Sequence, residues 1–177
     1  FLTSSLFLRY HSLFDFNMRE KTLYYIQMKN QLITAMCNQE FQLYYQPQID
    51  LSSGNIIGVE ALIRWMSSGK GCIPPIEFIP FAEKTGFICQ IDNWVFKTAC
   101  LQKKKWTELG YPNLIMSINL SGVRLMQDGL VSFMKKVLEE NNMDGSNIVI
   151  EITETAVMTD LEKAIEVLNE FKQLGIT

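Results

Sequence analysis

The sequence has little of what several kinds of active site require. It contains a single histidine, His11, and four widely spaced cysteines without a Cys-x-x-Cys pair. Catalytic pairs of the Ser-His or Cys-His type and a cysteine-based zinc site are therefore disfavoured. No apolar run approaches the eighteen or more residues of a membrane-spanning helix. These absences favour a cytoplasmic protein with reduced thiols and no membrane segment in this chain.

Strong positive charge is also missing. The formal net charge is -3 over 177 residues, which argues against a groove for a DNA or RNA polymer. The only basic run is Lys103-Lys104-Lys105. Because Leu101 and Trp106 flank it at helical spacing, we interpret this run as the solvent-facing side of a helix. With 47% hydrophobic and 20% charged residues, the chain has the composition of a folded globular domain.

The segment Glu60-Ala61-Leu62-Ile63-Arg64-Trp65 places two charges on one side of an expected strand. Side chains alternate along an extended chain, so Glu60, Leu62 and Arg64 share a face. Charged side chains that face inward need a cation, an anion or each other. The segment therefore predicts a binding site, and an exposed strand with a cross-strand ion pair is the alternative interpretation.

Two other short apolar segments, 114–121 and 147–153, end in oxygen-bearing side chains. Asn119 and Glu151 lie near the carboxyl ends of these expected strands. If the strands are parallel neighbours in a barrel, Glu60, Asn119 and Glu151 converge at the face where barrels keep their active sites. Carboxylate and amide oxygens without His or Cys suit Mg²⁺ or Mn²⁺ and disfavour zinc.

The order of expected elements is that of an α/β protein. A turn over 52–55 makes the first two strands antiparallel, and the later alternation of strand and helix favours a parallel sheet. The leading helix is expected to bury Leu23, Ile26, Ile33 and Met36, and Thr159 is expected to cap the last helix. Periodicity and turn signals predict a helix over 18–38, strands over 42–49 and 56–65, a loop over 69–75, and helices over 75–84, 91–109 and 128–141.

Five motifs follow one another along the chain. They are Tyr44-Tyr45-Gln46-Pro47, the segment 60–65, Ile73-Pro74-Pro75 leading into Phe78-Ile79-Pro80 and Ala82-Glu83, Ser117-Ile118-Asn119-Leu120-Ser121, and Glu151-Ile152-Thr153-Glu154. In this order they resemble the amino-terminal half of the EAL domain, a bacterial family that hydrolyses the second messenger cyclic di-GMP. The resemblance covers about Gln31 to Thr177. It implies a TIM-type (β/α)₈ barrel with an antiparallel first strand, present here as roughly the first half.

The resemblance also implies a metal site. In the complete domain two metal ions, Mg or Mn, would be bound, and Glu60, Asn119 and Glu151 match the positions of metal ligands. Such cations neutralise the charge of a phosphodiester and acidify a water molecule. We interpret Glu154, three residues after Glu151, as a supporting or helix-capping residue and not as a ligand.

Three further residues match substrate-binding positions of the family. The resemblance implies that Arg64 holds a phosphate of cyclic di-GMP, and that Gln46 and Leu62 line the nucleotide site. A guanidinium group suits the first role because its planar fork matches two phosphate oxygens.

The resemblance divides the chain into two parts. Residues 1–17 are similar to the linker that leaves a GGDEF domain, or are a remnant of that upstream domain. Residues 18–177 would form an incomplete EAL domain, with a leading helix over 18–38 and a half barrel over 41–177. Asn17 with Glu20 offers a capping box for that helix. The implied parent is a tandem protein of bacterial second-messenger signalling with a GGDEF domain before the EAL domain.

The expected function is that of a metal-dependent cyclic di-GMP phosphodiesterase domain that produces linear pGpG. The family's later Asp-Asp-Phe-Gly strand and its subsequent Lys and Glu are not among these residues, so the isolated chain is expected to be inactive. One alternative is a catalytically inactive module that binds cyclic di-GMP or another protein. Another is a structural half barrel whose open sheet edges pair with a second chain, a homodimer included.

Overall fold

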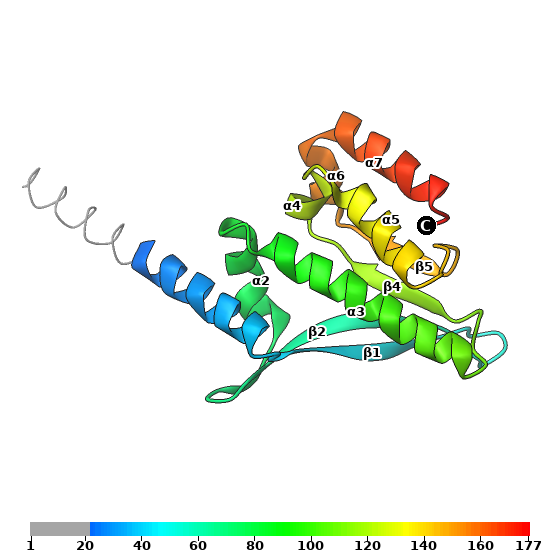
Figure 1. Ribbon diagram of the computed structural model, residues 1–177, viewed down its shortest axis with the longest axis horizontal. Helices are drawn as coiled ribbons and strands as arrows, with labels where there is room; N and C mark the ends of the chain where they lie inside the picture. Colours follow the sequence, from blue (N-terminus) through cyan, green and yellow to red (C-terminus); the bar gives the residue numbers. More distant parts are fainter. Residues whose placement is uncertain (1–21) are drawn as a thin grey trace, which may run out of the picture.

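The computed structural model describes residues 22–177 of the chain. A helix over 22–37 precedes a sheet that alternates with helices, and the coloured ribbon in Figure 1 follows this order. The remaining elements are β1 (Phe41–Ile49), β2 (Ile56–Ser67), β3 (Gly71–Ile73), α2 (Pro75–Lys84), α3 (Ile88–Glu108), β4 (Ile115–Asn119), α4 (Gly122–Leu125), α5 (Leu130–Glu140), β5 (Ile148–Glu151), α6 (Glu154–Thr159) and α7 (Leu161–Gln173).

The sheet combines an antiparallel and a parallel part. Its strand order is β1-β2-β4-β5, with β3 paired to β2. β1 and β3 run antiparallel to β2, whereas β2, β4 and β5 are parallel to one another. Beyond β5, the backbone N–H of Thr177 donates to Ile148 O at 3.1 Å, and the N–H of Ile150 donates to Thr177 O at 2.8 Å. The expected antiparallel first strand and parallel later strands are confirmed.

The turn between β1 and β2 is held by one aspartate. The Asp50 carboxylate accepts hydrogen bonds from the Ser52 N–H at 3.1 Å and from the Ser53 hydroxyl at 2.6 Å. These bonds, that from Ser53 first, lower the pKa of Asp50 to about 2. Gly54 takes a positive φ of 71°, which residues with a side chain rarely adopt. Local side-chain bonding of this kind favours a tight connection over a continued strand.

The two faces of the sheet differ in character. Val59, Ala61 and Trp65 on β2 are buried, and helix α3 packs against β1, β2 and β4. Figure 1 shows α3 lying along the sheet, with α5 and α7 following toward the carboxyl end of the chain. Glu60, Leu62 and Arg64 alternate with the buried residues and therefore occupy the opposite face. Burial of the apolar face drives the packing, whereas Glu60, Leu62 and Arg64 remain only partly buried.

Aromatic side chains form the centre of the core between β1, β2, α2 and α3. The Phe41 ring lies 6.0 Å from Trp65, 5.7 Å from Phe78 and 6.0 Å from Trp94, measured between ring centroids. Phe78 is fully buried, and its ring meets Trp65 edge to face at 5.8 Å. The Trp65 indole N–H donates to the Glu40 carboxylate at 2.8 Å, so its polar atom is satisfied.

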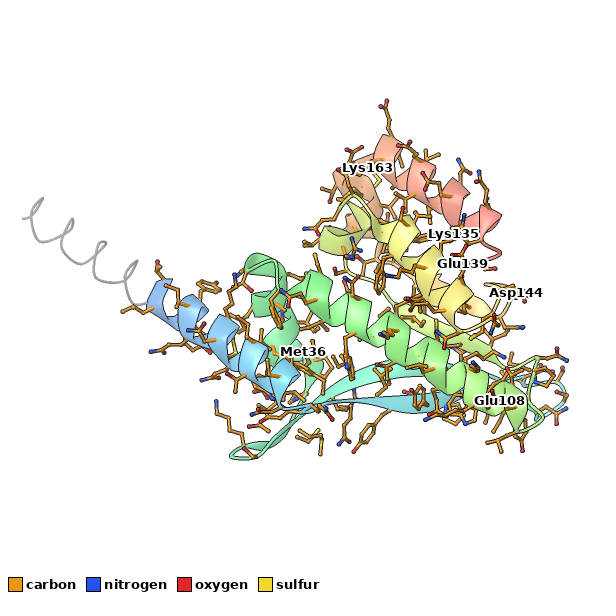
Figure 2. The ribbon with its side chains drawn as sticks, viewed as in Figure 1. Met36, Glu108, Lys135, Glu139, Asp144 and Lys163 are labelled. Atoms are coloured by element: carbon orange, nitrogen blue, oxygen red, sulfur yellow. The ribbon has the colours of Figure 1, made fainter. Side chains whose placement is uncertain are left out.

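Of the four residues that the sequence predicts to be buried on the leading helix, Met36 is partly buried and the other three are exposed. Leu23 and Ile26 are more than half exposed, and Ile33 is 40% exposed. The side chains that pack against the domain are Leu32, Ala35 and, in part, Met36, which Figure 2 places where the helix meets the body of the domain. This helix has apolar residues on two sides, and periodicity alone cannot tell which side the domain covers. The Asn17 and Glu20 capping box lies outside the described residues.

Several boundaries also differ from the sequence-based expectation. The expected loop over 69–75 contains β3, since Cys72 pairs with Met66 of β2. Helix α3 begins at Ile88, one turn earlier than expected, and the short helices α4 and α6 were not predicted. The cap of the last helix is Asp160 and not Thr159, because the Asp160 carboxylate accepts from the Lys163 N–H at 3.1 Å.

The interpretation of the lysine run was wrong for Lys103. This side chain is only 2% exposed, and its ammonium group donates to Pro112 O at 2.7 Å and to the Thr107 hydroxyl at 3.2 Å. Burial lowers the pKa of Lys103. The aliphatic stem of Lys103 is buried while its charge reaches backbone oxygen, whereas Lys105 remains exposed.

All four cysteines, Cys37, Cys72, Cys89 and Cys100, are free thiols. Cys89 and Cys100 are buried, and burial raises the pKa of Cys100 to about 12. A thiol that stays protonated is a poor nucleophile, so Cys100 acts as a packing residue. Within residues 22–177, no helix combines the length and hydropathy needed to cross a bilayer.

Candidate functional site

Strand register brings the three expected oxygen ligands together. Asn119 and Glu151 are paired residues at the ends of the parallel strands β4 and β5. The Asn119 side-chain NH₂ group donates to Glu60 Oε1 at 2.7 Å, although the two residues lie 59 positions apart in the chain. Asn119 therefore links the strands that carry the two carboxylates. The convergence expected from parallel neighbouring strands is what the structure shows.

Glu60 differs from the other two in its place along the strand. Asn119 and Glu151 end their strands, but Glu60 lies in the middle of β2 because β2 continues to Ser67 beside β1 and β3. The parallel pairing of β2 with β4 ends one residue after Glu60, where Ala61 is paired with Ile118. Glu60 thus occupies the carboxyl end of the parallel part of its strand, which explains how it reaches Asn119.

The other three expected site residues lie on the same open face of the β1–β2 hairpin. Gln46 is paired with Glu60 across the hairpin, and Tyr44 is paired with Leu62. The Arg64 guanidinium carbon lies 5.8 Å from the centroid of the Tyr44 ring, and its Nη1 group donates to Ile63 O at 2.8 Å. A cation over an aromatic face is held without losing its remaining N–H donors.

The alternative of a cross-strand ion pair is not formed. Among the residues that the structure describes, the ion pairs join Lys135 to Glu139, Lys136 to Glu140 and Lys163 to Asp128. Glu60 accepts a hydrogen bond from a neutral amide, and Arg64 binds backbone oxygen. Both charges thus remain available to a ligand of opposite charge.

A cavity of about 440 Å³ opens where the parallel strands end. Its wall combines Leu62 of β2, Asn119 and Glu151 at the ends of β4 and β5, and residues of α2 and α3. The apolar part of the wall comes from Ile79, Ile88, Ile91 and Val95, among others. Mostly apolar clefts with a few convergent polar groups are the usual form of a small-molecule site.

A buried polar network fixes the chain just beyond Asn119. Asp92 of α3 is 7% exposed, and its Oδ2 atom accepts from the Ser121 hydroxyl at 2.5 Å and from the Ser121 N–H at 3.3 Å. Ser121 in turn caps α4 by accepting from the Arg124 N–H at 3.1 Å. The Arg124 guanidinium, also buried, donates to Asn93 Oδ1 at 3.0 Å. The network ties the end of β4, and with it Asn119, to helix α3.

Sequence reasoning missed Asp92, although a signal was present. Asp92 interrupts an otherwise apolar helical face that includes Ile88, Ile91 and Val95. Since a carboxylate is rarely buried without partners, a charge within such a face indicates a polar contact made by tertiary structure. The partner, Ser121, is 29 positions away, and nothing in the local pattern of either segment identifies it.

Comparison with known proteins assigns the family. The family model of the EAL domain matches residues 29–177, a range that includes every expected site residue. The chain belongs to the EAL domain family. The strands and cavity described above are therefore those of part of an EAL domain.

Two similar proteins illustrate the relationship of this EAL domain to known sequences. The chain is 32% identical over 163 residues to the bifunctional diguanylate cyclase/cyclic di-GMP phosphodiesterase MucR of Pseudomonas aeruginosa, covering 92% of the chain and 24% of MucR. It is 34% identical over 158 residues to the cyclic di-GMP phosphodiesterase PdeR of Escherichia coli K12, covering 89% of the chain and 24% of PdeR. The chain thus spans about a quarter of the length of these relatives.

Solved structures agree in fold. The phosphodiesterase of MucR in complex with cyclic di-GMP superposes with a TM-score of 0.81 at 34% identity, covering 85% of this EAL domain chain and 61% of that chain. The EAL enzyme Bd1971, bound to cAMP and cyclic di-GMP, superposes with a TM-score of 0.80 at 30% identity. The match covers 89% of this chain and 44% of the Bd1971 chain. The expectation of an EAL-type barrel, present in part, is confirmed.

The donor atoms of this EAL domain fit a hard divalent cation. Two carboxylates and an amide lie on neighbouring strands, and the NH₂ group of Asn119 faces Glu60, which leaves the amide oxygen for another partner. Oxygen ligands of this kind suit Mg²⁺ or Mn²⁺. Within residues 22–177, no group of three His, Cys, Asp or Glu side chains is placed to hold a metal ion, so a cation here would also need the amide oxygen of Asn119.

Asp92 gives this EAL domain a pH-dependent stability. Burial, opposed by the bonds from Ser121, raises the pKa of Asp92 from 3.8 to about 6. Between these values the folded state binds more protons than the unfolded state, so the free energy of unfolding falls as pH rises. An Asp92→Asn variant is expected to lose this dependence, on the order of 2 to 3 kcal/mol between pH 4 and pH 7. Urea unfolding at both pH values measures the change.

Asp144→Asn is the matched control for this measurement. Bonds from Ser146 lower the pKa of Asp144, so its contribution to stability is lost as pH falls, which is the opposite sign. Equal pH dependence in wild type and Asp92→Asn would contradict the role of the buried carboxyl group.

Proposed function

We propose that this EAL domain is part of a cyclic di-GMP phosphodiesterase that hydrolyses the cyclic dinucleotide to linear pGpG with divalent metal ions. The observation that carries the proposal is the junction of Glu60, Asn119 and Glu151 at the end of the parallel strands, beside the cavity. Relatives named as cyclic di-GMP phosphodiesterases support the same activity. A structure at 34% identity holds cyclic di-GMP, which supports the choice of substrate.

Glu60, Asn119 and Glu151 are the proposed ligands of Mg²⁺ or Mn²⁺. When bound, such ions would neutralise the phosphodiester and lower the pKa of a water molecule. The contribution of the chain is to hold the oxygens in place. The hydrogen bond from Asn119 orients one carboxylate, and the Asp92–Ser121 contact fixes the segment that follows Asn119.

Arg64, Gln46 and Leu62 are the proposed substrate-binding residues. Tyr44 and Ile63 O restrain the Arg64 guanidinium, while its other N–H groups remain to bind phosphate oxygens. Gln46 is exposed on the same face and offers an amide to a base or a ribose. Leu62 lines the cavity and provides apolar surface for a base.

For the 177-residue polypeptide by itself, we propose little or no turnover. The three proposed ligands supply fewer oxygens than the six that Mg²⁺ prefers, and Gln46 and Asn119 are exposed to water. An open site keeps water on every charge, which weakens electrostatic stabilisation of a transition state.

We also propose the domain division that the sequence suggests. Residues 1–17 would be a linker or a remnant of an upstream domain, and residues 18–177 would be the EAL part, in a cytoplasmic signalling protein that carries a GGDEF domain. MucR supports this arrangement because its name combines a cyclase with a phosphodiesterase. Limited proteolysis of the full-length gene product, with cleavage expected near residue 17 and protection after residue 22, tests the boundary.

A binding module without catalysis is the second candidate function. Glu60, Asn119 and Glu151 weigh against it, whereas Arg64 and the cavity would serve binding without catalysis equally well. The two candidates differ in product. The full-length gene product, incubated with cyclic di-GMP and Mn²⁺, is expected to release pGpG, which chromatography detects. Saturable binding of cyclic di-GMP with no pGpG would overturn the phosphodiesterase and leave the binding module.

An Arg64→Lys variant tests the phosphate contact. Lysine keeps the charge but presents a single ammonium in place of a two-pronged donor, so we expect KM for cyclic di-GMP to rise about ten- to a hundredfold. Initial rates over a range of substrate concentrations measure KM. Lys105→Arg, an exchange of the same two residue types at an exposed position of α3, is the control and should leave KM unchanged. An unaltered KM in Arg64→Lys would remove Arg64 from the substrate site.

A further inference from the structure

The leading helix presents an apolar stripe to solvent. Leu23 is 58% exposed, Ile26 52% and Ile33 40%, while Leu32 and Ala35 on the opposite side are buried against the domain. Figure 1 shows this helix beside α2, with its first turns reaching away from the sheet. One side of the helix thus anchors it, and the other exposes large hydrophobic side chains. An exposed stripe of this kind indicates an interaction surface.

The spacing of the stripe identifies the kind of partner that fits it. Leu23, Ile26, Asn30, Ile33 and Cys37 follow one another at alternating steps of three and four residues, and Asn30 and Cys37 are also exposed. This is the spacing of the a and d positions of a coiled coil, in which the a positions are 23, 30 and 37. The natural occupant of such a stripe is another helix with the same repeat.

Asn30 and the flanking residues favour a second copy of the same helix. A single asparagine at an a position pairs with itself in a parallel, in-register dimer, where each amide satisfies the other. The positions that flank the stripe are mostly uncharged, and Lys29 is the only charged residue between 22 and 37. In parallel pairing Lys29 would face the uncharged Thr34 of the other copy, so no like charges oppose the contact.

Two heptads are too short to form a stable coiled coil as free peptides. Here the cost of helix formation is already met, because Leu32, Ala35 and Met36 hold the helix against the domain. Each helix therefore enters the contact preformed. The apolar surface of the stripe is then available to stabilise association.

We propose that residues 22–37 form a parallel two-stranded coiled coil with the same helix of a second copy of this chain. The proposal goes beyond the phosphodiesterase function and does not depend on it. The contact lies on the leading helix, apart from the strand ends that carry the candidate site. It would place two EAL domains side by side with their leading helices aligned in the same direction.

The oligomeric state of the 177-residue chain tests this surface. Sedimentation equilibrium is expected to give a dimer for wild type and for Gln31→Lys, which adds a charge at an exposed position outside the stripe. Ile26→Lys is expected to raise the dimer dissociation constant at least tenfold, because it places two charges in the apolar contact. A dimer of unchanged strength in Ile26→Lys would overturn the proposal and point to pairing through the sheet edges. A monomeric wild type at high micromolar concentration would overturn it as well.

Cysteine crosslinking tests the parallel register without altering the stripe. In a parallel coiled coil the two Cys37 residues are neighbours at a distance that a disulfide can span. We expect mild oxidation of a Cys72→Ser variant, which lacks the other exposed thiol, to give a covalent dimer. Cys37→Ser in the same background is the control and should remain uncrosslinked. In antiparallel pairing the two Cys37 residues would lie about 20 Å apart, so failure to crosslink in a dimeric sample would overturn the parallel arrangement.

Discussion

A Glu151→Gln variant is expected to lose cyclic di-GMP hydrolysis by a hundredfold or more. Glu151 ends β5 beside Asn119, at the cavity where the parallel strands terminate. The exchange keeps the shape of the side chain but removes one negative charge from a set that has only two carboxylates. Loss of groups that merely orient a ligand costs about ten- to a hundredfold, and loss of a ligand should cost more. Rates of pGpG formation by the full-length gene product measure the effect.

Glu154→Gln is the matched control, since it makes the same exchange three residues later. Glu154 is exposed in the first turn of α6 and is interpreted as a supporting or helix-capping residue, so its removal should lower activity by no more than about tenfold. Binding of Mn²⁺, followed by the electron paramagnetic resonance signal of the free ion, gives a readout other than activity. We expect Glu151→Gln to weaken that binding far more than Glu154→Gln does. Equal losses in the two variants would contradict the assignment of Glu151.

A Phe78→Ala variant should produce the largest change in stability. Phe78 is fully buried, and its ring contacts Phe41 and Trp65 at centroid distances of 5.7 Å and 5.8 Å. Removing a buried phenyl ring leaves a cavity and costs about 3 to 5 kcal/mol of the free energy of unfolding. Urea unfolding of the 177-residue chain, followed by tryptophan fluorescence, measures the loss. Trp65 and Trp94 lie in the same cluster and report on it directly.

Ile76→Ala provides the comparison within the same helix. Ile76 is 81% exposed, so the same kind of truncation should change the free energy of unfolding by less than about 0.5 kcal/mol. A loss of similar size in both variants would contradict the role assigned to the aromatic cluster, because alanine favours a helix at both positions.

The candidate site was largely predictable because local pattern and chain order determine it. Alternation along β2 places Glu60, Leu62 and Arg64 on one face, whatever the helices do. The parallel order of β2, β4 and β5 then brings Asn119 between Glu60 and Glu151. The alternation and the strand order both follow from short sequence motifs and their order along the chain. The motifs were therefore sufficient to locate these side chains.

The burial of other residues could not be predicted, because it depends on which surfaces pack together in the tertiary structure. The leading helix has two apolar sides, and only the docked domain selects Leu32 and Ala35 for burial. Lys103 is in a basic run, yet its environment is set by the Pro112 carbonyl oxygen nine residues later. Asp92 likewise depends on a serine from another element. In each case a tertiary contact outweighs the local pattern.

The antiparallel and parallel parts of the sheet differ in the sequence separation of the residues that they bring together. The Asp50 turn closes only the few residues between Ile49 and Ile56, whereas the bond from Asn119 to Glu60 joins residues that are 59 positions apart. By loop-closure entropy, the longer closure costs about 2 kcal/mol more. Contacts of high sequence separation are also intrinsically slow to form. The hairpin that carries Arg64 can therefore form early. Glu60, Asn119 and Glu151 come together only in the slower step that forms the long-range contacts.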